Sequence, residues 1–223
     1  MLLIYNTIKS SEPRDYFDMI ARKRLFPYLS FDTIYLDKKP DSFAKYTHLL
    51  LTGSELSASN GSEYDAAIFA VIGGFVQARK PILGICHGHQ MLARYLAGDE
   101  YCRRALRPEF GFKSMQIIDD QLFSGIINPI FLESRYDEVF ALPDEFKIIA
   151  ANETEAVQGF RYKDLPFWGI QFHPEFVFED GEAMLQRHLE QNPTDRAYYR
   201  NDLKDAQKLE QNLRIFHNFL QSK

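Results

Sequence analysis

The sequence predicts an α/β fold, a three-layer sandwich in which helices cover both faces of a central, mostly parallel sheet. Two observations support this fold class. Short apolar runs alternate with helix-like segments in the N-terminal half, and closely spaced strand candidates with few helical patterns fill residues 112–172. The chain has 223 residues, 45% of them hydrophobic, enough for one substantial core but too few for two ordinary domains of ~150 residues each. We therefore expect a single domain over residues 1–223.

The elements of the N-terminal half follow from residue type and period. Apolar, β-rich runs, several of them bounded by Gly, Asp or Pro, predict buried strands at residues 2–5, 33–36, 48–51 and 82–85. Helix-like stretches between some of them predict helices at residues 15–24, 63–79 and 88–96. Because parallel strands need long crossovers, this alternation predicts a parallel sheet covered by helices.

The C-terminal half has a different pattern. Apolar runs at residues 116–118, 147–150 and 167–172 predict antiparallel strands added beside the parallel sheet. From about residue 179 to 223 we expect a helical extension, which begins with a helix at residues 180–191. Apolar residues then recur at intervals of three and four, at Ala206, Leu209, Leu213, Phe216 and Leu220. This spacing predicts one long helix with a single apolar face.

Composition excludes several classes of partner. The chain has 26 Lys and Arg against 31 Asp and Glu, a formal net charge of -5, so it offers no basic field for nucleic acid. The N-terminal run MLLIYN is too short for a signal-peptide core, and the longest apolar stretch, residues 66–76, falls short of the ~20 residues of a membrane span. We therefore expect an unprocessed protein with no nucleic-acid or membrane partner.

The two cysteines, Cys86 and Cys102, make a disulfide framework improbable and fit a reducing compartment, so a cytoplasmic location is expected. His48, His188 and His217 have no carboxylate or cysteine spacing that suggests a metal site, and there is no nucleotide-binding loop. Neither a metal nor a cofactor is expected.

One segment concentrates the chemistry. In PILGICHGHQ, a predicted strand runs directly into Gly84-Ile85-Cys86-His87-Gly88, and a helix-forming run follows. This is the G-x-nucleophile-x-G elbow with sulfur in place of oxygen. The tight strand-to-helix turn brings backbone so close that side chains two before and two after the nucleophile would collide, which explains both glycines.

Cys86 at this turn is exposed to the unpaired N–H groups and the positive dipole end of the following helix, which favour a thiolate. The alternative is that Cys86 is a small buried apolar residue and that the glycines serve only close packing. The elbow by itself does not decide between these two interpretations.

A second segment supplies partners for the sulfur. His173, Pro174 and Glu175 end a predicted strand far along the chain from Cys86. Pro174 biases His173 toward an extended conformation, in which His173 and Glu175 lean to the same side. A carboxylate bonded to one ring nitrogen fixes the tautomer and leaves the other nitrogen for sulfur. Alone, His-Pro-Glu is also consistent with a turn that ends a strand.

Together, GICHGHQ and QFHPE, with Cys86 and His173 87 residues apart, resemble the two signatures of class I glutamine amidotransferases. The resemblance spans nearly the whole chain, because LLLTGSELS lies where the family's oxyanion loop belongs and Glu109-Phe110-Gly111 resembles another recurring element. Within this family, the chain most resembles the amidotransferase domain of GMP synthetase and its stand-alone relatives. The resemblance implies a flavodoxin-like sandwich for the fold.

The resemblance also implies roles for individual residues. Cys86 is then the nucleophile, His173 the general acid and base, and Glu175 its orienter. Backbone N–H groups of Gly53 and His87 form the oxyanion hole. The substrate is held by Gln90 and by the backbone of three consecutive residues, Ser134, Arg135 and Tyr136.

Two loops depart from the family pattern. Gly53-Ser54-Glu55 replaces the usual Gly-Gly-Pro, and Ser134-Arg135-Tyr136-Asp137 replaces Ser-His-Gly-Asp. Both are expected as loops that face the substrate. Because serine adopts positive φ less readily than glycine, the oxyanion loop is expected to have a different shape or to form only on activation.

The implied reaction hydrolyses the side-chain amide of glutamine to glutamate and ammonia through a thioester on Cys86. The chain has no room for an acceptor domain, so the ammonia is expected to serve a synthetase on another chain. The altered loops leave a free-standing γ-glutamyl amide or peptide hydrolase as an alternative. A non-catalytic regulator with the same fold is the third hypothesis.

Overall fold

A computed structural model describes residues 1–204 and 206–223, except for the side chains of 206–208, and contains a central eight-stranded sheet in the order β2-β1-β3-β4-β10-β9-β8-β6. The parallel strands are β1 (Leu2–Asn6), β2 (Phe31–Tyr35), β3 (His48–Leu51), β4 (Ile82–Ile85) and β10 (Phe167–Ile170). Antiparallel strands β9 (Gly159–Tyr162), β8 (Phe146–Ala151) and β6 (Gln116–Ile117) extend one edge. The predicted mixed, mostly parallel sheet is confirmed, and its parallel part has the flavodoxin-like order. Residues 167–172 were expected among the added antiparallel strands, but β10 pairs parallel with β4 and antiparallel with β9, so it joins the two parts of the sheet.

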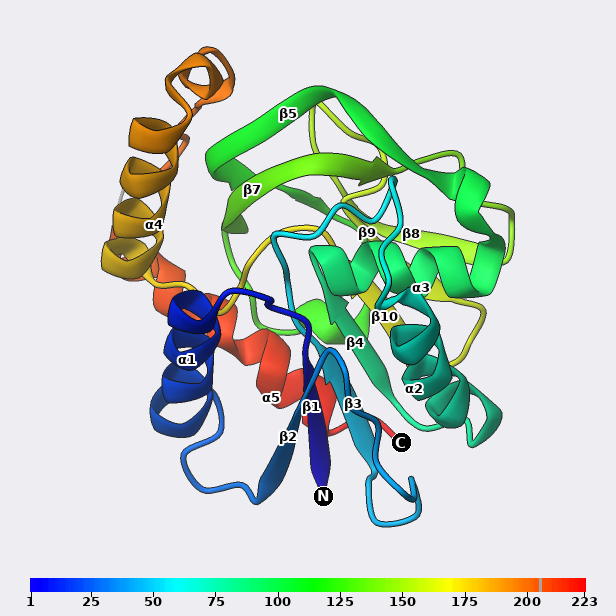
Figure 1. The fold of residues 1–223 in the computed structure, drawn as a ribbon. Helices are drawn as coiled ribbons and strands as arrows, with labels where there is room; N and C mark the ends of the chain where they lie inside the picture. Colours follow the sequence, from blue (N-terminus) through cyan, green and yellow to red (C-terminus); the bar gives the residue numbers. More distant parts are fainter. Residues whose placement is uncertain (205) are drawn as a thin grey trace.

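Helices cover both faces of this sheet (Figure 1). Helix α1 (Ser11–Ile20), which continues as a π-helical turn (Ala21–Leu25), and α5 (Arg214–Leu220) lie on one face, whereas α2 (Asp65–Gln77) and α3 (His87–Ala97) lie on the other. The strand period of two explains the layers, because alternate residues of β1 enter opposite cores. None of the described helices is long and apolar enough to cross a membrane.

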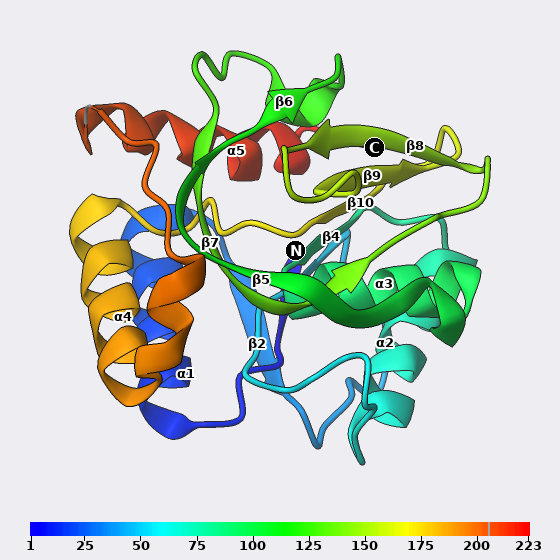
Figure 2. The same cartoon turned by 90° about the horizontal axis from the view of Figure 1, so that it is seen from above.

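A second, two-stranded sheet lies beyond the carboxyl ends of the parallel strands, where β5 (Cys102–Ser114) and β7 (Ile130–Val139) pair antiparallel (Figures 1 and 2). The sequence did not predict it, because Pro108 and Gly111 argue against a strand. The register shifts between Arg104 and Glu109, which accommodates Pro108. Gly111 has φ +119°, and a Cβ there would lie 1.8 Å from the Arg200 carbonyl oxygen, so the close approach of the C-terminal segment requires glycine.

The C-terminal segment consists of α4 (Phe178–Gln191), two 3-10 helices (Pro193–Tyr198 and Ala206–Leu213), and α5. The prediction of one long helix is wrong, because its apolar residues serve two separate cores. Leu209 packs with Phe110 and Leu132 near the second sheet, whereas Phe216 packs against the central sheet. The predicted contribution of the Ala206 side chain lies outside the described residues.

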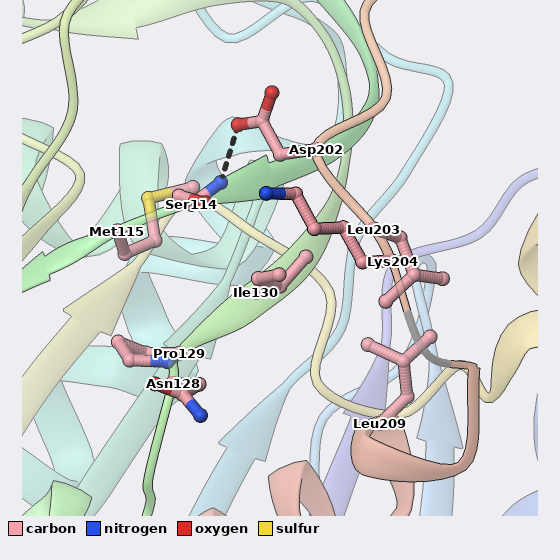
Figure 3. A pocket seen from close by; sticks show the side chains of 9 residues that line it. All are labelled: Ser114, Met115, Asn128, Pro129, Ile130, Asp202, Leu203, Lys204 and Leu209. Atoms are coloured by element: carbon pink, nitrogen blue, oxygen red, sulfur yellow. Dashed lines mark hydrogen bonds between the residues drawn. The ribbon is translucent and has the colours of Figure 1, made fainter.

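The segment between the two 3-10 helices is held against β5 by hydrogen bonds of Asp202. The Asp202 N–H donates to the Phe112 carbonyl at 2.8 Å. The Asp202 carboxylate accepts from the Ser114 N–H at 2.9 Å (Figure 3). A surface cavity of about 410 Å³ lies beside this contact. The C-terminal segment therefore braces the second sheet from outside.

Docking of α5 on the central sheet can be tested at Phe219, which is fully buried with its ring 6.4 Å from that of Trp168. We expect Phe219→Ala to lower the free energy of unfolding by ~3–5 kcal/mol, because the site cannot collapse fully around the lost ring. Chemical denaturation measures this change, and Tyr28→Ala, at a fully exposed residue, is the control. A loss below ~1 kcal/mol for Phe219→Ala contradicts the docking of α5.

Candidate active site

Cys86 lies in the turn between β4 and α3 with φ 50° and ψ -106°, a strained conformation for a residue with a side chain. Hydrogen bonds hold this turn to both neighbouring strands. The Cys86 N–H donates to Ile170 of β10 at 2.9 Å, and the Gly88 N–H donates to Thr52 after β3 at 3.1 Å. The predicted elbow is therefore present at the carboxyl edge of the sheet.

The two glycines of the elbow have the predicted steric role. A Cβ on Gly84 would lie 2.4 Å from the Gly88 carbonyl oxygen, and a Cβ on Gly88 would lie 2.6 Å from the Leu51 Cβ. Larger side chains at either position would push α3 away from the sheet. The turn that presents Cys86 thus depends on both glycines.

His173 reaches the same edge because β10 is the neighbour of β4, with Ile170 opposite Ile85. Its Nδ1 lies 2.7 Å from the Glu175 carboxylate, and its backbone N–H donates to Leu132 of β7 at 2.9 Å. With Nδ1 bonded to the carboxylate, Nε2 is the ring nitrogen left to exchange a proton with the Cys86 sulfur.

Burial disfavours the charged imidazolium, but the Glu175 carboxylate and the Cys86 sulfur outweigh it and raise the pKa of His173 well above its usual value. The charged ring can therefore persist at neutral pH as the counter-ion of a thiolate. Glu175 is buried at 2% exposure, so its interaction with the ring is little screened by water.

The candidate oxyanion donors lie beside this pair. A Cβ on Gly53 would lie 2.8 Å from His173 Cε1 and 3.5 Å from the Cys86 Cβ, so the loop touches both residues. In the described part of the chain, the N–H groups of Gly53, Ser54 and His87 have no acceptor. Ser54 was not singled out as a donor by the sequence. Its φ is not positive, so the predicted steric conflict does not arise.

The His87 imidazole is completely enclosed, and burial lowers its pKa to about 4, which keeps the ring neutral. Only the backbone of His87 is available to the site. Gln90 is also buried, and its amide nitrogen donates to the Asp137 carbonyl at 3.1 Å and to the Gln171 side chain at 2.9 Å. Both donors of the Gln90 side chain therefore have internal partners.

Ser134, Arg135 and Tyr136 lie within strand β7, so the expectation that they form a loop is wrong. The Ser134 carbonyl oxygen accepts from the Cys86 sulfur at 3.9 Å, which places this part of the strand beside that sulfur. The Tyr136 hydroxyl is bonded to Asp195, beside His188 of α4. The sequence did not predict this strand, because its charged and polar residues are not typical of a buried strand. In the structure, its charged side chains pair with residues that are distant in the sequence.

The Arg135 side chain is fully buried and does not enter the candidate oxyanion hole. Its guanidinium lies 2.6 Å from Glu109 and 2.7 Å from Glu155, and the Glu109 carboxylate also accepts from Gln158 at 2.8 Å. Burial raises the pKa of Glu155 to about 8 and that of the adjacent Glu133 well above its usual value. We call Arg135 with these three glutamates the Arg135 cluster.

The structure thus brings together Cys86, His173 and Glu175 with the backbone of Gly53, His87 and Ser134. The side chains of Gln90, Arg135 and Tyr136 point to internal partners instead. In the sequence, the signal that could have indicated the Arg135 cluster is the row of charged residues at alternate positions of β7. This arrangement can perform nucleophilic attack by sulfur with proton transfer through one histidine.

The Glu175 interaction predicts a change in titration. Glu175→Gln removes the charge that favours the imidazolium, so the pKa of His173 should fall and the ring should lose its proton at lower pH than in wild type. NMR titration of the ring measures this shift, with His173→Gln to assign the signal among the six histidines. An unchanged titration would show that Glu175 does not control this proton.

The Arg135 cluster predicts a pH-dependent stability. Arg135→Leu leaves buried carboxylates without their positive partner, and at pH 8 we expect a loss of ~3–5 kcal/mol in the free energy of unfolding. Burial raises the folded-state pKa of Glu155 to about 8, so this acid is neutral in the folded protein near pH 5 and ionises as pH rises through about 8. The loss caused by Arg135→Leu should therefore be smaller near pH 5 and should grow as pH rises through and above about 8, where wild-type Arg135 pairs with ionised Glu155.

Chemical denaturation at several pH values measures this effect. Arg187→Leu is the control, because Arg187 pairs with Glu12 and both side chains are exposed, and surface pairs contribute only ~0–1 kcal/mol. A loss for Arg135→Leu that does not vary with pH contradicts the charge account.

The profile of the family described as "Glutamine amidotransferase class-I" matches residues 36–192, more than half of the chain. A subunit of the glutamine-hydrolyzing GMP synthase of Pyrococcus furiosus is 36% identical over 111 residues, which cover 49% of this chain and 58% of that protein. The corresponding protein of Sulfolobus acidocaldarius is 33% identical over 153 residues, 66% of this chain and 78% of that protein. The chain thus spans less than two thirds of the Pyrococcus relative.

Solved structures share the fold. A glutamine amidotransferase from Thermotoga maritima has a TM-score of 0.74 and 22% identity, over 99% of this chain and 96% of its own. A glutamine amidotransferase from Methylobacillus flagellatus has a TM-score of 0.75 and 19% identity, over 98% and 93%. These likenesses concern the fold alone. Because the family profile covers more than half of its length, this chain belongs to the class I glutamine amidotransferase family.

Proposed function

We propose that this protein hydrolyses the side-chain amide of glutamine to glutamate and ammonia, with Cys86 as nucleophile, His173 as acid and base, and Glu175 as the residue that orients His173. The observation that carries the proposal is the positive-φ turn at Cys86 beside the buried His173–Glu175 pair. Such a pair explains why a costly conformation is retained at a cysteine. A merely structural thiol has no need of either feature.

The reaction proceeds in two balanced steps. The Cys86 thiolate attacks the side-chain carbonyl carbon, and N–H groups of the oxyanion loop and His87 stabilise the charge that develops on oxygen. His173 gives its proton to the departing nitrogen, which leaves as ammonia and creates a γ-glutamyl thioester. Water then attacks the thioester, His173 accepts its proton, and the sulfur leaves as thiolate with release of glutamate.

The substrate is held against β7 in this proposal. The backbone of Ser134, Arg135 and Tyr136 provides polar groups next to the sulfur, and the Gln90 side chain supports this strand through the Asp137 carbonyl. Gln90 then acts through the strand, because both of its donors are engaged. We further propose that residues 1–223 form one domain whose helical extension, about 179–223, braces the second sheet.

We propose that the ammonia passes to a separate synthetase chain. The designation of several relatives as one subunit of GMP synthase supports this partner. The alternative is a free-standing γ-glutamyl amide or peptide hydrolase. The observation that favours this alternative is that Ser54 and Glu55 of the oxyanion loop form hydrogen bonds within the chain itself.

The proposal predicts that the pure protein releases equal amounts of glutamate and ammonia from glutamine and that Cys86→Ala abolishes this release. Cys102→Ala is the matched control, because burial raises the pKa of that thiol to about 12 and leaves it unreactive. Activity in Cys86→Ala equal to that of wild type would exclude the mechanism.

A panel of γ-glutamyl amides and peptides separates the two candidate functions. Preference for glutamine, together with glutamine-dependent GMP formation when the synthetase chain of a GMP synthase is added, supports the amidotransferase. Faster turnover of larger γ-glutamyl compounds, with no GMP formed, supports the free-standing hydrolase.

A further inference from the structure

The oxyanion loop, defined here as residues 52–55, is fastened along its length to the segment that follows β1. The Thr7 N–H donates to the Thr52 hydroxyl at 2.9 Å, and the Thr7 hydroxyl donates to the Thr52 carbonyl at 3.0 Å and the Gly53 carbonyl at 3.1 Å. The Thr52 carbonyl also accepts from Gly88 of the elbow. The loop is therefore tied to the nucleophile turn on one side and to Thr7 on the other.

These bonds fix the direction of the peptide units. In a trans peptide the N–H points opposite to the carbonyl. Because the Gly53 carbonyl is turned to Thr7, the Ser54 N–H in the same peptide unit points away from Thr7. Rotation of this peptide unit would require the loss of the Thr7 hydrogen bond.

The two residues that replace the family's second glycine and proline add further bonds. The Ser54 hydroxyl donates to the Thr7 carbonyl at 2.6 Å and accepts from the Leu56 N–H at 3.1 Å. The Glu55 carboxylate accepts from the backbone N–H of Lys9 at 3.1 Å and of Ser10 at 2.5 Å. Glycine and proline have no side-chain group that could make these bonds.

The Glu55 bonds involve a charged acceptor. Although partial burial opposes ionisation, the Ser10 side chain and the N–H groups of Ser10 and Lys9 keep the pKa of Glu55 below its usual value. Hydrogen bonds to a carboxylate are roughly twice as strong as those between neutral groups. The exposed Glu55 side chain is thus held in one position by these hydrogen bonds.

We propose that Ser54 and Glu55 are positioning residues that clamp the oxyanion loop to residues 7–10, so that the loop has its working shape in the isolated chain and hydrolysis needs no partner. This inference rests on the proposed glutamine hydrolysis. Gly53 touches the His173 ring, so movement of the loop displaces both an oxyanion donor and the catalytic base. A displacement of ~1 Å can cost ~100-fold in rate.

The test compares Ser54→Ala, Glu55→Ala and Glu55→Gln in the isolated protein, with Glu190→Gln at an exposed site of α4 as control. We expect kcat for glutamine to fall ~10-fold or more in Glu55→Ala with KM changed less than ~3-fold, because the loop acts mainly on the transition state. Glu55→Gln, which keeps one oxygen acceptor, should be intermediate.

Two further readouts separate positioning from general damage. Binding of the γ-aldehyde analogue of glutamine, whose thiohemiacetal places an oxyanion in the hole, should weaken by the same factor as kcat. Alkylation of Cys86 by iodoacetamide, which needs no oxyanion hole, should change less than ~2-fold. Equal losses in both readouts would indicate general damage and overturn the positioning role.

Amide hydrogen exchange tests the clamp without any substrate. Exchange across residues 52–56 should accelerate in Glu55→Ala, and unchanged exchange overturns the clamp. If the wild-type protein hydrolyses glutamine only after a synthetase chain is added, the loop does not have its working shape in the isolated chain, and the proposal is overturned. Absence of glutamine turnover under both conditions, with faster exchange in the variant, counts against the proposed function and not against the clamp.

Discussion

A cysteine with φ 50° and ψ -106° costs ~1–3 kcal/mol relative to relaxed backbone, so the conformation persists only where its surroundings impose it. Here Gly84 and Gly88 permit the close approach of α3 to the sheet, and hydrogen bonds to Ile170 and Thr52 hold the turn from both sides. The same two neighbouring strands lead to His173 and to the oxyanion loop. The two strands that hold the Cys86 turn therefore also place His173 and the oxyanion loop beside it.

Around this turn, the site is built from backbone contributed by separate elements. Strand β7 supplies the Leu132 carbonyl that holds His173 and the Ser134 carbonyl next to the sulfur. The Arg135 cluster supports β7 from inside, and the Tyr136–Asp195 contact supports it from the C-terminal segment. With the loop clamped as proposed, loop and strand are both fixed before substrate arrives, which is the condition for electrostatic stabilisation of a transition state.

The sequence predicted the parts that depend on local pattern. The parallel strands are apolar and β-rich, and the elbow requires its glycines. Cys86, His173 and Glu175 were singled out by two short motifs whose joint resemblance to one family implied their roles. Strands β5 and β7 were missed because Pro108, Gly111 and the charges of β7 contradict a strand locally, whereas bulge, close packing and buried ion pairs permit it. The roles of Ser54 and Glu55 depend on Thr7 and Ser10, so only the tertiary structure brings out the contacts that fix the loop.

The central claim is that Cys86 carries the γ-glutamyl group during the reaction, and rapid acid quench of the protein during turnover of glutamine tests it most directly. Mass spectrometry of the digested protein should find a γ-glutamyl thioester on the peptide that contains Cys86, formed and lost at rates that account for turnover. Glutamine consumption with no adduct on that peptide, under quench conditions that preserve a synthetic thioester, would contradict the account.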